Sequence, residues 1–210
     1  MSTVRHHHRK KKNHGVAIII ILVISIILGF AIDAGVTFID RQLHPVKYSD
    51  YVEKYAKEYN VPVSLMYAII KTESNFEADA VSRVGAVGLM QFMPDTFRDI
   101  TTNFLFENLD IGMRYDPETS IKYGAFYISW IYQNYAHNWE TALAAYNAGI
   151  GNVFGYTDPE TGEHIDGWLD DPEYSDDGVT LKKIPFKETR NYIKKVTRAQ
   201  KKYQALYSLS

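Results

Sequence analysis

The chain has 210 residues, of which 46% are hydrophobic, enough for one globular domain with a core and a few added segments. It contains no cysteine, which excludes a disulfide framework, a cysteine-ligated metal and a thiol nucleophile. The net charge of −2 hides an uneven distribution, because residues 1–14 carry five basic and no acidic side chains while the remainder holds 18 basic and 25 acidic residues. A body this acidic argues against a nucleic-acid partner, since phosphate contacts need clustered Lys and Arg.

An apolar segment follows this basic tail. Residues 16–32 contain no charged side chain, and extending the run to Ile39 adds only Asp33. A membrane-spanning helix needs about 20 mostly apolar residues, so a transmembrane signal-anchor helix is predicted over residues 15–39. The positive-inside rule keeps the tail in the cytoplasm and places the remainder of this single-pass cell-membrane protein outside. A cleaved signal peptide is the alternative, disfavoured by the length of the run and by the lack of a small-x-small cleavage site.

Residues 40–47 are interpreted as a short juxtamembrane linker, and helical periodicity begins directly after it. Apolar side chains recur at helical spacing from Ser49 onward. Pro62 and Pro94 each suit the first turn of a further helix, where a missing backbone N–H has no cost. The first half of the exported part is therefore predicted to be helical.

Start and stop signals continue along the second half. Asp116 followed by Pro117 is typical of an N-cap and the first helical position. Asn138 can cap the next helix, and Gly149 can close it. A last amphipathic helix is predicted over about residues 187–207, where apolar side chains again form one stripe.

Residues 155–181 interrupt this pattern. The segment is rich in Gly, Pro, Asp and Glu and shows little periodicity, which predicts a long acidic loop. One interpretation is a flap that lengthens a cleft, with Trp168 or Tyr174 stacking on a ligand, but a solvated loop is the commoner case. Since no succession of alternating strand segments occurs anywhere in the chain, the predicted fold class is mainly α.

The residue with the clearest chemical potential is Glu73. It lies in the last turn of a predicted helix and continues an apolar face formed by Met66, Ile69 and Ile70. Burial disfavours the charged carboxylate, and so does the negative end of the helix dipole, so both effects favour a protonated general acid. From position alone, a glutamate that turns to solvent beyond the helix end is the commoner situation.

Three motifs follow Glu73-Ser74 in order. The first, S-x-x-G-A-x-G-L-M-Q, begins at Ser82; A-Y-N-A-G begins at Ala145, and E-T-R-N-Y begins at Glu188. Each motif alone is weak, but in this order and spacing they resemble the soluble lytic transglycosylase (SLT) domain, a lysozyme-like family. The resemblance covers residues 48–207. It implies a mainly α, lysozyme-like SLT catalytic domain preceded by one transmembrane helix, in an enzyme that acts on bacterial peptidoglycan.

The resemblance also implies roles for matching residues. Glu73 resembles the family's single catalytic acid/base. The positions that resemble substrate-binding residues are Ser82, Met90 through its backbone, Gln91, Tyr146, Asn147 and Tyr192. Within this set, the hydroxyl of Ser82 resembles one that positions the muramyl group, and Tyr192 resembles a late tyrosine near the catalytic carboxyl. Plain structural roles remain open, since the Met90 side chain suits a core and Tyr146 suits a packing ring.

The mechanism implied by this family needs one carboxyl. Ordinary glycosidases use two, but Glu77 and Asp79 follow the predicted helix end and are interpreted as solvated charges. The resemblance implies that Glu73 protonates the oxygen between N-acetylmuramic acid and N-acetylglucosamine. It then takes the proton from the muramyl C6 hydroxyl, which closes a 1,6-anhydro ring. No metal and no cofactor are implied, and the implied partners are peptidoglycan strands and the cytoplasmic membrane through residues 15–39.

Three alternatives remain open at this stage. A hydrolytic muramidase similar to goose-type lysozyme would use a second acid over the cleft. A non-catalytic peptidoglycan-binding module would not need Glu73. A dedicated partner of a secretion or conjugation machine would still be an enzyme. The membrane tether favours local remodelling of the wall close to the membrane.

Overall fold

The structure is a computed structural model that describes residues 14–209. The predicted basic tail, residues 1–14, lies outside the described residues apart from His14, where the first helix begins. The chain divides into two compact units, one ending at Leu43 and the other beginning at His44. Each unit is described by itself.

The first unit is a single long helix, α1 (His14–Leu43), of 30 residues. At 1.5 Å per residue it is about 45 Å long. Its apolar side chains from Ile18 to Ile39 are exposed, and among the described helices it alone has the length and composition to cross a membrane. Because the helix runs to Leu43, the first four residues of the segment predicted as a linker are helical. Membrane insertion of residues 15–39 stays a prediction.

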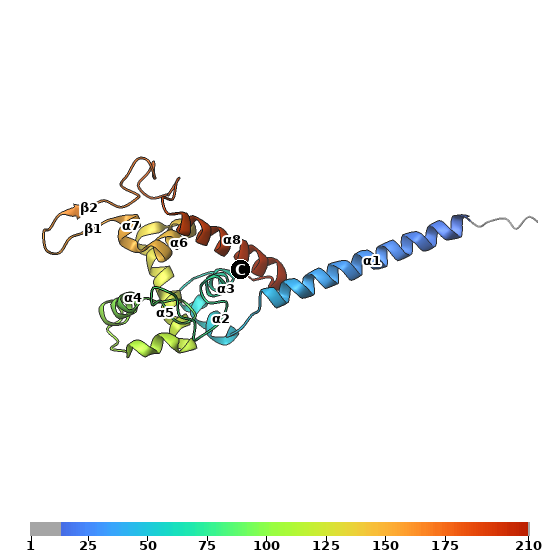
Figure 1. Ribbon diagram of the computed structural model, residues 1–210, viewed down its shortest axis with the longest axis horizontal. Helices are drawn as coiled ribbons and strands as arrows, with labels where there is room; N and C mark the ends of the chain where they lie inside the picture. The colour runs from blue at the N-terminus through green and yellow to red at the C-terminus, as the bar shows by residue number, and fades with distance from the viewer. Residues whose placement is uncertain (1–13, 210) are drawn as a thin grey trace, which may run out of the picture. The chain divides into compact units, whose positions relative to one another are not determined.

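The second unit is mainly α, as the sequence predicted (Figure 1). Two of its turns of helix are π-helical, and one is a 3-10 helix. In chain order the elements are α2 (Ser49–Glu58), α3 (Val63–Glu73), α4 (Pro94–Arg98), η1 (Asp99–Phe104), η2 (Ile111–Tyr115), α5 (Pro117–Ile131), η3 (Tyr132–Ala136), α6 (Trp139–Ala148), α7 (Ile150–Phe154), β1 (Tyr156–Thr157), β2 (His164–Ile165) and α8 (Lys187–Tyr207).

The predicted helix boundaries are confirmed where a capping side chain fixes them. The Asp116 carboxylate accepts a hydrogen bond from the Thr119 backbone N–H at 2.8 Å, and the Asn138 side chain accepts one from Thr141 at 2.8 Å. Each bond satisfies an N–H group that has no partner within the helix. Gly149, with φ of 94°, ends α6 as predicted.

The core is built around α3, which packs against α8 and α2. The helix is apolar on nearly every side, and Met66, Ile69 and Ile70 are completely buried. The ring of Tyr67 stacks on that of Tyr203 from α8, with centroids 5.3 Å apart. Full burial of each such side chain stabilises the fold by about 1.5–3 kcal/mol, so α3 and α8 hold each other in register.

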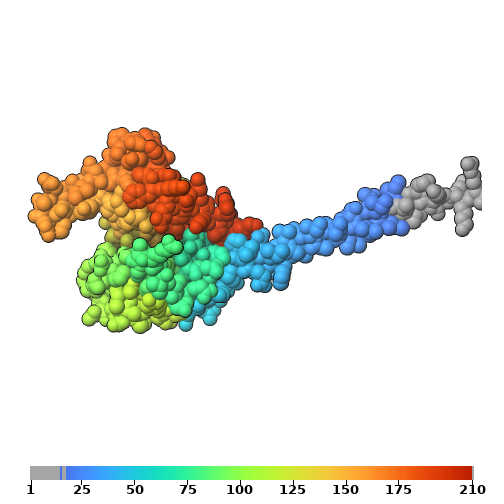
Figure 2. Space-filling model, in the orientation of Figure 1, coloured from blue at the N-terminus to red at the C-terminus, as the bar shows by residue number. Residues whose placement is uncertain are grey.

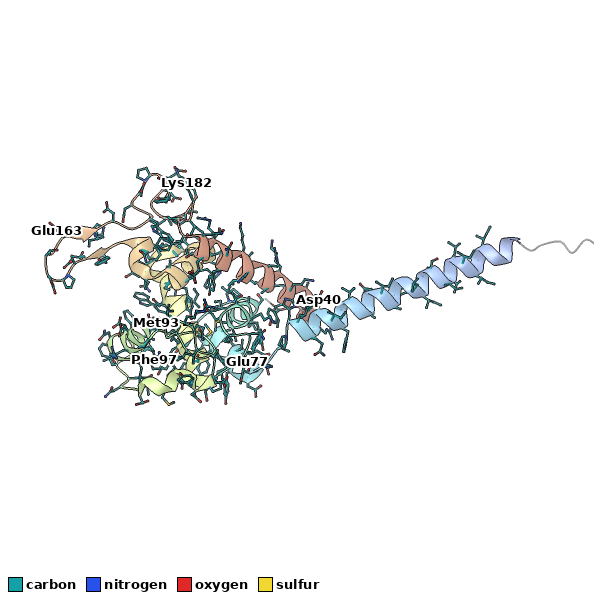
Figure 3. All side chains as sticks on the ribbon, in the orientation of Figure 1. Asp40, Glu77, Met93, Phe97, Glu163 and Lys182 are labelled. Carbon is teal, nitrogen blue, oxygen red and sulfur yellow. The ribbon has the colours of Figure 1, made fainter. Side chains whose placement is uncertain are left out.

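The segment 155–181 is partly an exposed loop and partly anchored. β1 and β2 form a short antiparallel hairpin with Tyr156 opposite Ile165, and Glu163 lies near its tip (Figure 3). Figure 2 shows the surface hollowed between this orange hairpin and the green region of α4. Further on, Trp168 is only 8% exposed, because its ring packs edge-on against Phe186. The segment is therefore a projecting hairpin followed by an irregular stretch pinned to the core.

One prediction concerns Gly88, whose φ is +80° and where an added Cβ would lie 2.0 Å from the backbone oxygen of Arg114. Gly85 is the matched control, because its φ is +86° but nothing lies within 4 Å of an added Cβ. We expect Gly85→Ala to cost about 1–2 kcal/mol from the positive φ alone, a shift of a few degrees in Tm. Gly88→Ala must also displace backbone, so its Tm should fall clearly further. Thermal melts followed by circular dichroism measure both, and equal shifts would contradict the close approach to Arg114.

Candidate active site

The site is centred on Glu73, the last residue of α3. The chain turns sharply after it, through Asn75 and Phe76, whose φ values of 52° and 65° are unusual for residues other than glycine. The Ser74 hydroxyl donates to the carbonyl oxygen of Leu89 at 3.0 Å. The end of α3 is thereby fixed to the loop that precedes α4, and the carboxyl of Glu73 has a defined position.

Two cavities meet at Glu73. The first has a volume of about 240 Å³, and the second of about 580 Å³. Both are lined by Glu73, Asn147 and Glu188. The first is also lined by Ser82, Val84, Ala86, Gln91, Phe92, Met93, Thr96, Tyr127 and Tyr146. The second is also lined by Thr72, Lys187, Asn191, Tyr192 and Lys195. An extended ligand lying across both cavities would pass Glu73 near its middle.

Burial sets the protonation state of Glu73. It raises the pKa of the carboxyl from its ordinary 4.5 to about 7, because desolvation disfavours the carboxylate. The hydroxyl of Tyr192 faces the carboxyl and opposes this rise, a smaller effect. Tyr192 itself is buried, and its hydroxyl has no formed hydrogen bond to any described residue. The carboxyl therefore lies beside a donor group that is not committed elsewhere, and it is largely protonated below pH 7.

Ser82 and Gln91, both predicted as site residues, line the first cavity. The Ser82 hydroxyl oxygen accepts a hydrogen bond from the backbone N–H of Ala86 at 2.9 Å, so its own proton remains available. The side-chain amide of Gln91 donates to the carbonyl oxygens of Ala80 and Gly88, at 3.2 and 3.0 Å. Its carbonyl oxygen is then oriented by the loop as an acceptor.

Tyr146, Asn147 and Tyr192 also line the cavities, whereas Met90 does not. The Met90 side chain is completely buried and would collide with any Cβ added at Gly124 of α5. Its backbone takes part in another way, because the Tyr146 hydroxyl donates to the Met90 carbonyl oxygen at 2.9 Å. Met90 therefore supports the ring of Tyr146 and lies behind the cavity wall.

Several residues of the cavity walls were not singled out from the sequence. Tyr127 comes from α5, for which the sequence had indicated only the helix start at Asp116 and Pro117. Glu188 belongs to the quoted E-T-R-N-Y motif but had no role, and it is the second carboxylate beside both cavities. Lys187 and Lys195, eight residues apart on α8, also line the second cavity. The motif could have identified Glu188, but only the tertiary fold reveals Tyr127 and the lysines.

Other residues considered from the sequence lie elsewhere. Glu77 and Asp79 are exposed and line neither cavity beside Glu73. The buried Trp168 and the half-buried Tyr174 line neither cavity either. In the described part of the chain, the grouping of His and carboxylate side chains with metal-ligand spacing is His164, Asp166 and Asp170. These three residues are on or beside the hairpin, exposed, and outside both cavities.

Known proteins resemble this chain in sequence and in structure. Residues 50–164 match the family described as "Transglycosylase SLT domain". The soluble lytic murein transglycosylase of Escherichia coli K12 is 35% identical over 154 residues, which cover 72% of this chain and 22% of that protein. The membrane-bound lytic murein transglycosylase C of Actinobacillus pleuropneumoniae is 32% identical over 169 residues, covering 75% of this chain and 46% of that protein.

The structure also resembles solved structures of lytic transglycosylases. The crystal structure of the 70 kDa soluble lytic transglycosylase of Escherichia coli matches with a TM-score of 0.64 and 31% identity, covering 79% of this chain and 25% of that one. An inactive mutant of the lytic transglycosylase Slt of Pseudomonas aeruginosa matches with a TM-score of 0.61 and 30% identity, covering 80% of this chain and 25% of that one. The chain thus spans less than half the length of these relatives. Its helical unit from His44 onward has their lysozyme-like catalytic fold, and the chain belongs to the transglycosylase SLT domain family.

Proposed function

We propose that this chain is a membrane-anchored peptidoglycan lytic transglycosylase. It cleaves the β-1,4 bond between N-acetylmuramic acid and N-acetylglucosamine without water and leaves 1,6-anhydro-muramyl ends. The observation that carries the proposal is the carboxyl of Glu73, with a pKa of about 7, at the meeting point of two cavities. A general acid works best when its pKa is close to the working pH. The names of the relatives point to murein as the substrate.

One carboxyl performs both proton transfers in this mechanism. Protonated Glu73 donates its proton to the glycosidic oxygen, the bond to the muramyl C1 breaks, and N-acetylglucosamine leaves as an alcohol. The acetamido oxygen of the same muramyl group stabilises the positive charge that develops at C1. Glu73, now a carboxylate, takes the proton of the C6 hydroxyl as that oxygen bonds to C1. The acid is regenerated, and no water enters the balance.

The neighbouring side chains hold the sugars in this geometry. The free proton of Ser82 serves as a donor to the muramyl group, and the oriented oxygen of Gln91 accepts from an acetamido N–H. Asn147, which lines both cavities, contacts the sugars on either side of the scissile bond. Tyr192 places its uncommitted hydroxyl where it stabilises the carboxylate form of Glu73 between the two proton transfers. Holding reactants in position in this way accounts for much of enzymatic catalysis.

In this proposal, the exposed apolar helix α1 anchors the protein in the cytoplasmic membrane. Residues 15–39 span the cytoplasmic membrane, the basic tail stays inside, and the catalytic unit lies outside. The anchor limits cleavage to wall close to the membrane, which suits local remodelling during growth or during insertion of a surface machine.

One prediction from the proposed function concerns Glu73→Gln. Loss of the general acid should reduce the release of muropeptides from purified peptidoglycan by about 100-fold or more, because an amide cannot supply the proton. Mass spectrometry of the wild-type digest should show 1,6-anhydro ends, one water lighter than hydrolysed ends. Glu77→Gln is the matched control, since Glu77 is exposed four residues away and should keep full activity. Undiminished release by Glu73→Gln would refute the assignment.

A further prediction concerns the pH dependence of the reaction rate. Since the proton donor must be protonated, kcat/KM should fall as the pH rises above about 7, the pKa of Glu73. A rate profile on peptidoglycan fragments measures this. A limb that falls near pH 4.5 instead would mean that Glu73 is not the group whose protonated form acts.

A measurement of protein stability tests the same pKa of Glu73 independently of enzymatic activity. The pKa of Glu73 is about 7 in the folded protein and close to 4.5 when unfolded, so the folded state binds a proton more tightly between these values. Stability from this group is complete below pH 4.5 and is lost as the pH rises through 7, by up to about 3 kcal/mol. Glu73→Gln removes this dependence, so the variant should gain stability relative to wild type at high pH. Parallel Tm-against-pH curves would contradict burial of the carboxyl.

A hydrolytic muramidase is the second candidate, favoured by Glu188. As a second carboxylate beside both cavities, it could activate a water that attacks C1. Hydrolysis predicts reducing muramic-acid ends that vanish in Glu188→Gln. The lytic mechanism predicts anhydro ends from wild type and from Glu188→Gln alike, with at most a weaker rate. Glu163→Gln, at the hairpin tip, is the control for loss of one surface charge (Figure 3).

A further inference from the structure

Charge is segregated within the second unit. Helix α8 carries seven Lys and Arg and one Glu, a net charge of +6, whereas residues 44–186 carry ten basic and 22 acidic side chains, a net charge of −12. Such a division is not needed for folding, because the core-facing residues of α8 are uncharged. A basic helix on an acidic body instead gives the unit a strong electric dipole.

Six of the seven basic residues of α8 line two different cavities. Lys187 and Lys195 line a cavity beside Glu73, as described above. The outer side forms a separate groove of about 730 Å³ between α8 and the start of α6. Its lining is Glu140, Ile193, Lys194, Thr197, Arg198, Lys201, Lys202 and Ala205, none of which lines the cavities of the catalytic site.

Three of the four cations in this outer groove have no ion-pair partner among the described residues. Of its cations, Lys194, Arg198 and Lys201 are exposed and form no ion pair with any residue that the structure describes. Glu140 is the acidic residue of the lining. The three side chains are spaced by four and three residues, so they project from one side of the helix. We name Lys194, Arg198 and Lys201 the basic outer face.

The C-terminal part of α8 is hydrogen-bonded to the residues that follow α1 in the sequence. The Tyr207 hydroxyl of α8 donates to the carbonyl oxygen of His44 at 2.8 Å, and that of Tyr203 donates to Pro45 at 3.1 Å. His44 directly follows Leu43, the last residue of α1. At 1.5 Å per residue, Lys201 lies about 9 Å and Lys194 about 20 Å along α8 from Tyr207. A Debye length is about 8–10 Å in physiological salt, so a charged surface at the end of α1 would act on Lys201, and it would act on Lys194 as well when α8 lies along that surface.

We propose that the basic outer face binds the anionic phospholipid headgroups of the membrane that holds α1. This rests on the membrane anchoring in the proposed function and adds a second, electrostatic contact to it. Each Lys or Arg near an anionic surface contributes about fivefold to binding, and the anchor keeps the local lipid concentration high. The acidic remainder of the unit is repelled by the same surface. The contact therefore orients the catalytic unit, with α8 toward the lipid.

The test uses the full chain, which contains no native cysteine, so that one introduced cysteine can be labelled alone. Thr197→Cys, within the groove, carries a polarity-sensitive fluorophore, and Thr161→Cys in the hairpin carries the same label as a matched control. The protein is reconstituted into vesicles of phosphatidylcholine alone or of equal parts phosphatidylcholine and phosphatidylglycerol. We expect a blue shift at position 197 only in the anionic vesicles, reversed by high salt. Replacing all three cations of the basic outer face by Gln should lower the docked-to-undocked ratio by about 100-fold.

Three results would overturn the proposal: no shift at position 197, an equal shift at position 161, or a shift in neutral vesicles on addition of peptidoglycan fragments. The last would assign the groove to a wall polymer. If α1 did not anchor the chain in the membrane, the protein would not float with the vesicles. In detergent, the triple variant should release muropeptides as the wild type does. If the wild type itself released none, the proposed enzymatic activity would be refuted, whereas the fluorescence measurement would remain valid.

Discussion

The packing of α3 against α8 is the contact on which the site depends. Met66, Ile69 and Ile70 bury one side of α3 completely, and Glu73 is the next position along that side. The carboxyl therefore lies at the edge of the core, where desolvation raises its pKa. The buried Tyr192, from α8, completes the surroundings of the carboxyl. A single apolar interface thus sets both the position and the protonation state of the proposed acid.

A single helix, α8, serves three surfaces because its side chains project in different directions. Val196 and Tyr203 belong to the core, Lys187 and Lys195 line the cavity beside Glu73, and the basic outer face lines a separate groove. The same helix ends at the residues that continue from α1. The cavity beside Glu73, the core and the proposed lipid contact therefore share one helix, so a tilt of α8 relative to a membrane would move the cavity with it.

The wall opposite α8 gains its rigidity from backbone geometry. Gln91 adopts a φ of 50°, and Gly88 leaves no room for a Cβ against Arg114. Such conformations persist when the surroundings over-determine them, and here the carbonyl oxygens of Leu89 and Met90 are bonded by Ser74 and Tyr146. These two bonds join the loop to the ends of α3 and α6. Glu73-Ser74 and the motifs that begin at Ser82 and Ala145 therefore form one connected frame.

The sequence by itself predicted the longer helices of the second unit, the caps at Asp116, Asn138 and Gly149, and Glu73 at the end of an apolar face, because helical periodicity and capping act over a few residues. The motifs also indicated most of the cavity lining. Only the tertiary structure decided that Met90 lies behind the wall, that Trp168 packs against Phe186, and that Tyr127 lines the first cavity. It also decided that side chains near the C-terminal end of α8 donate hydrogen bonds to the backbone of His44 and Pro45. These features depend on contacts between segments far apart in the chain, and local patterns carry no information about such contacts.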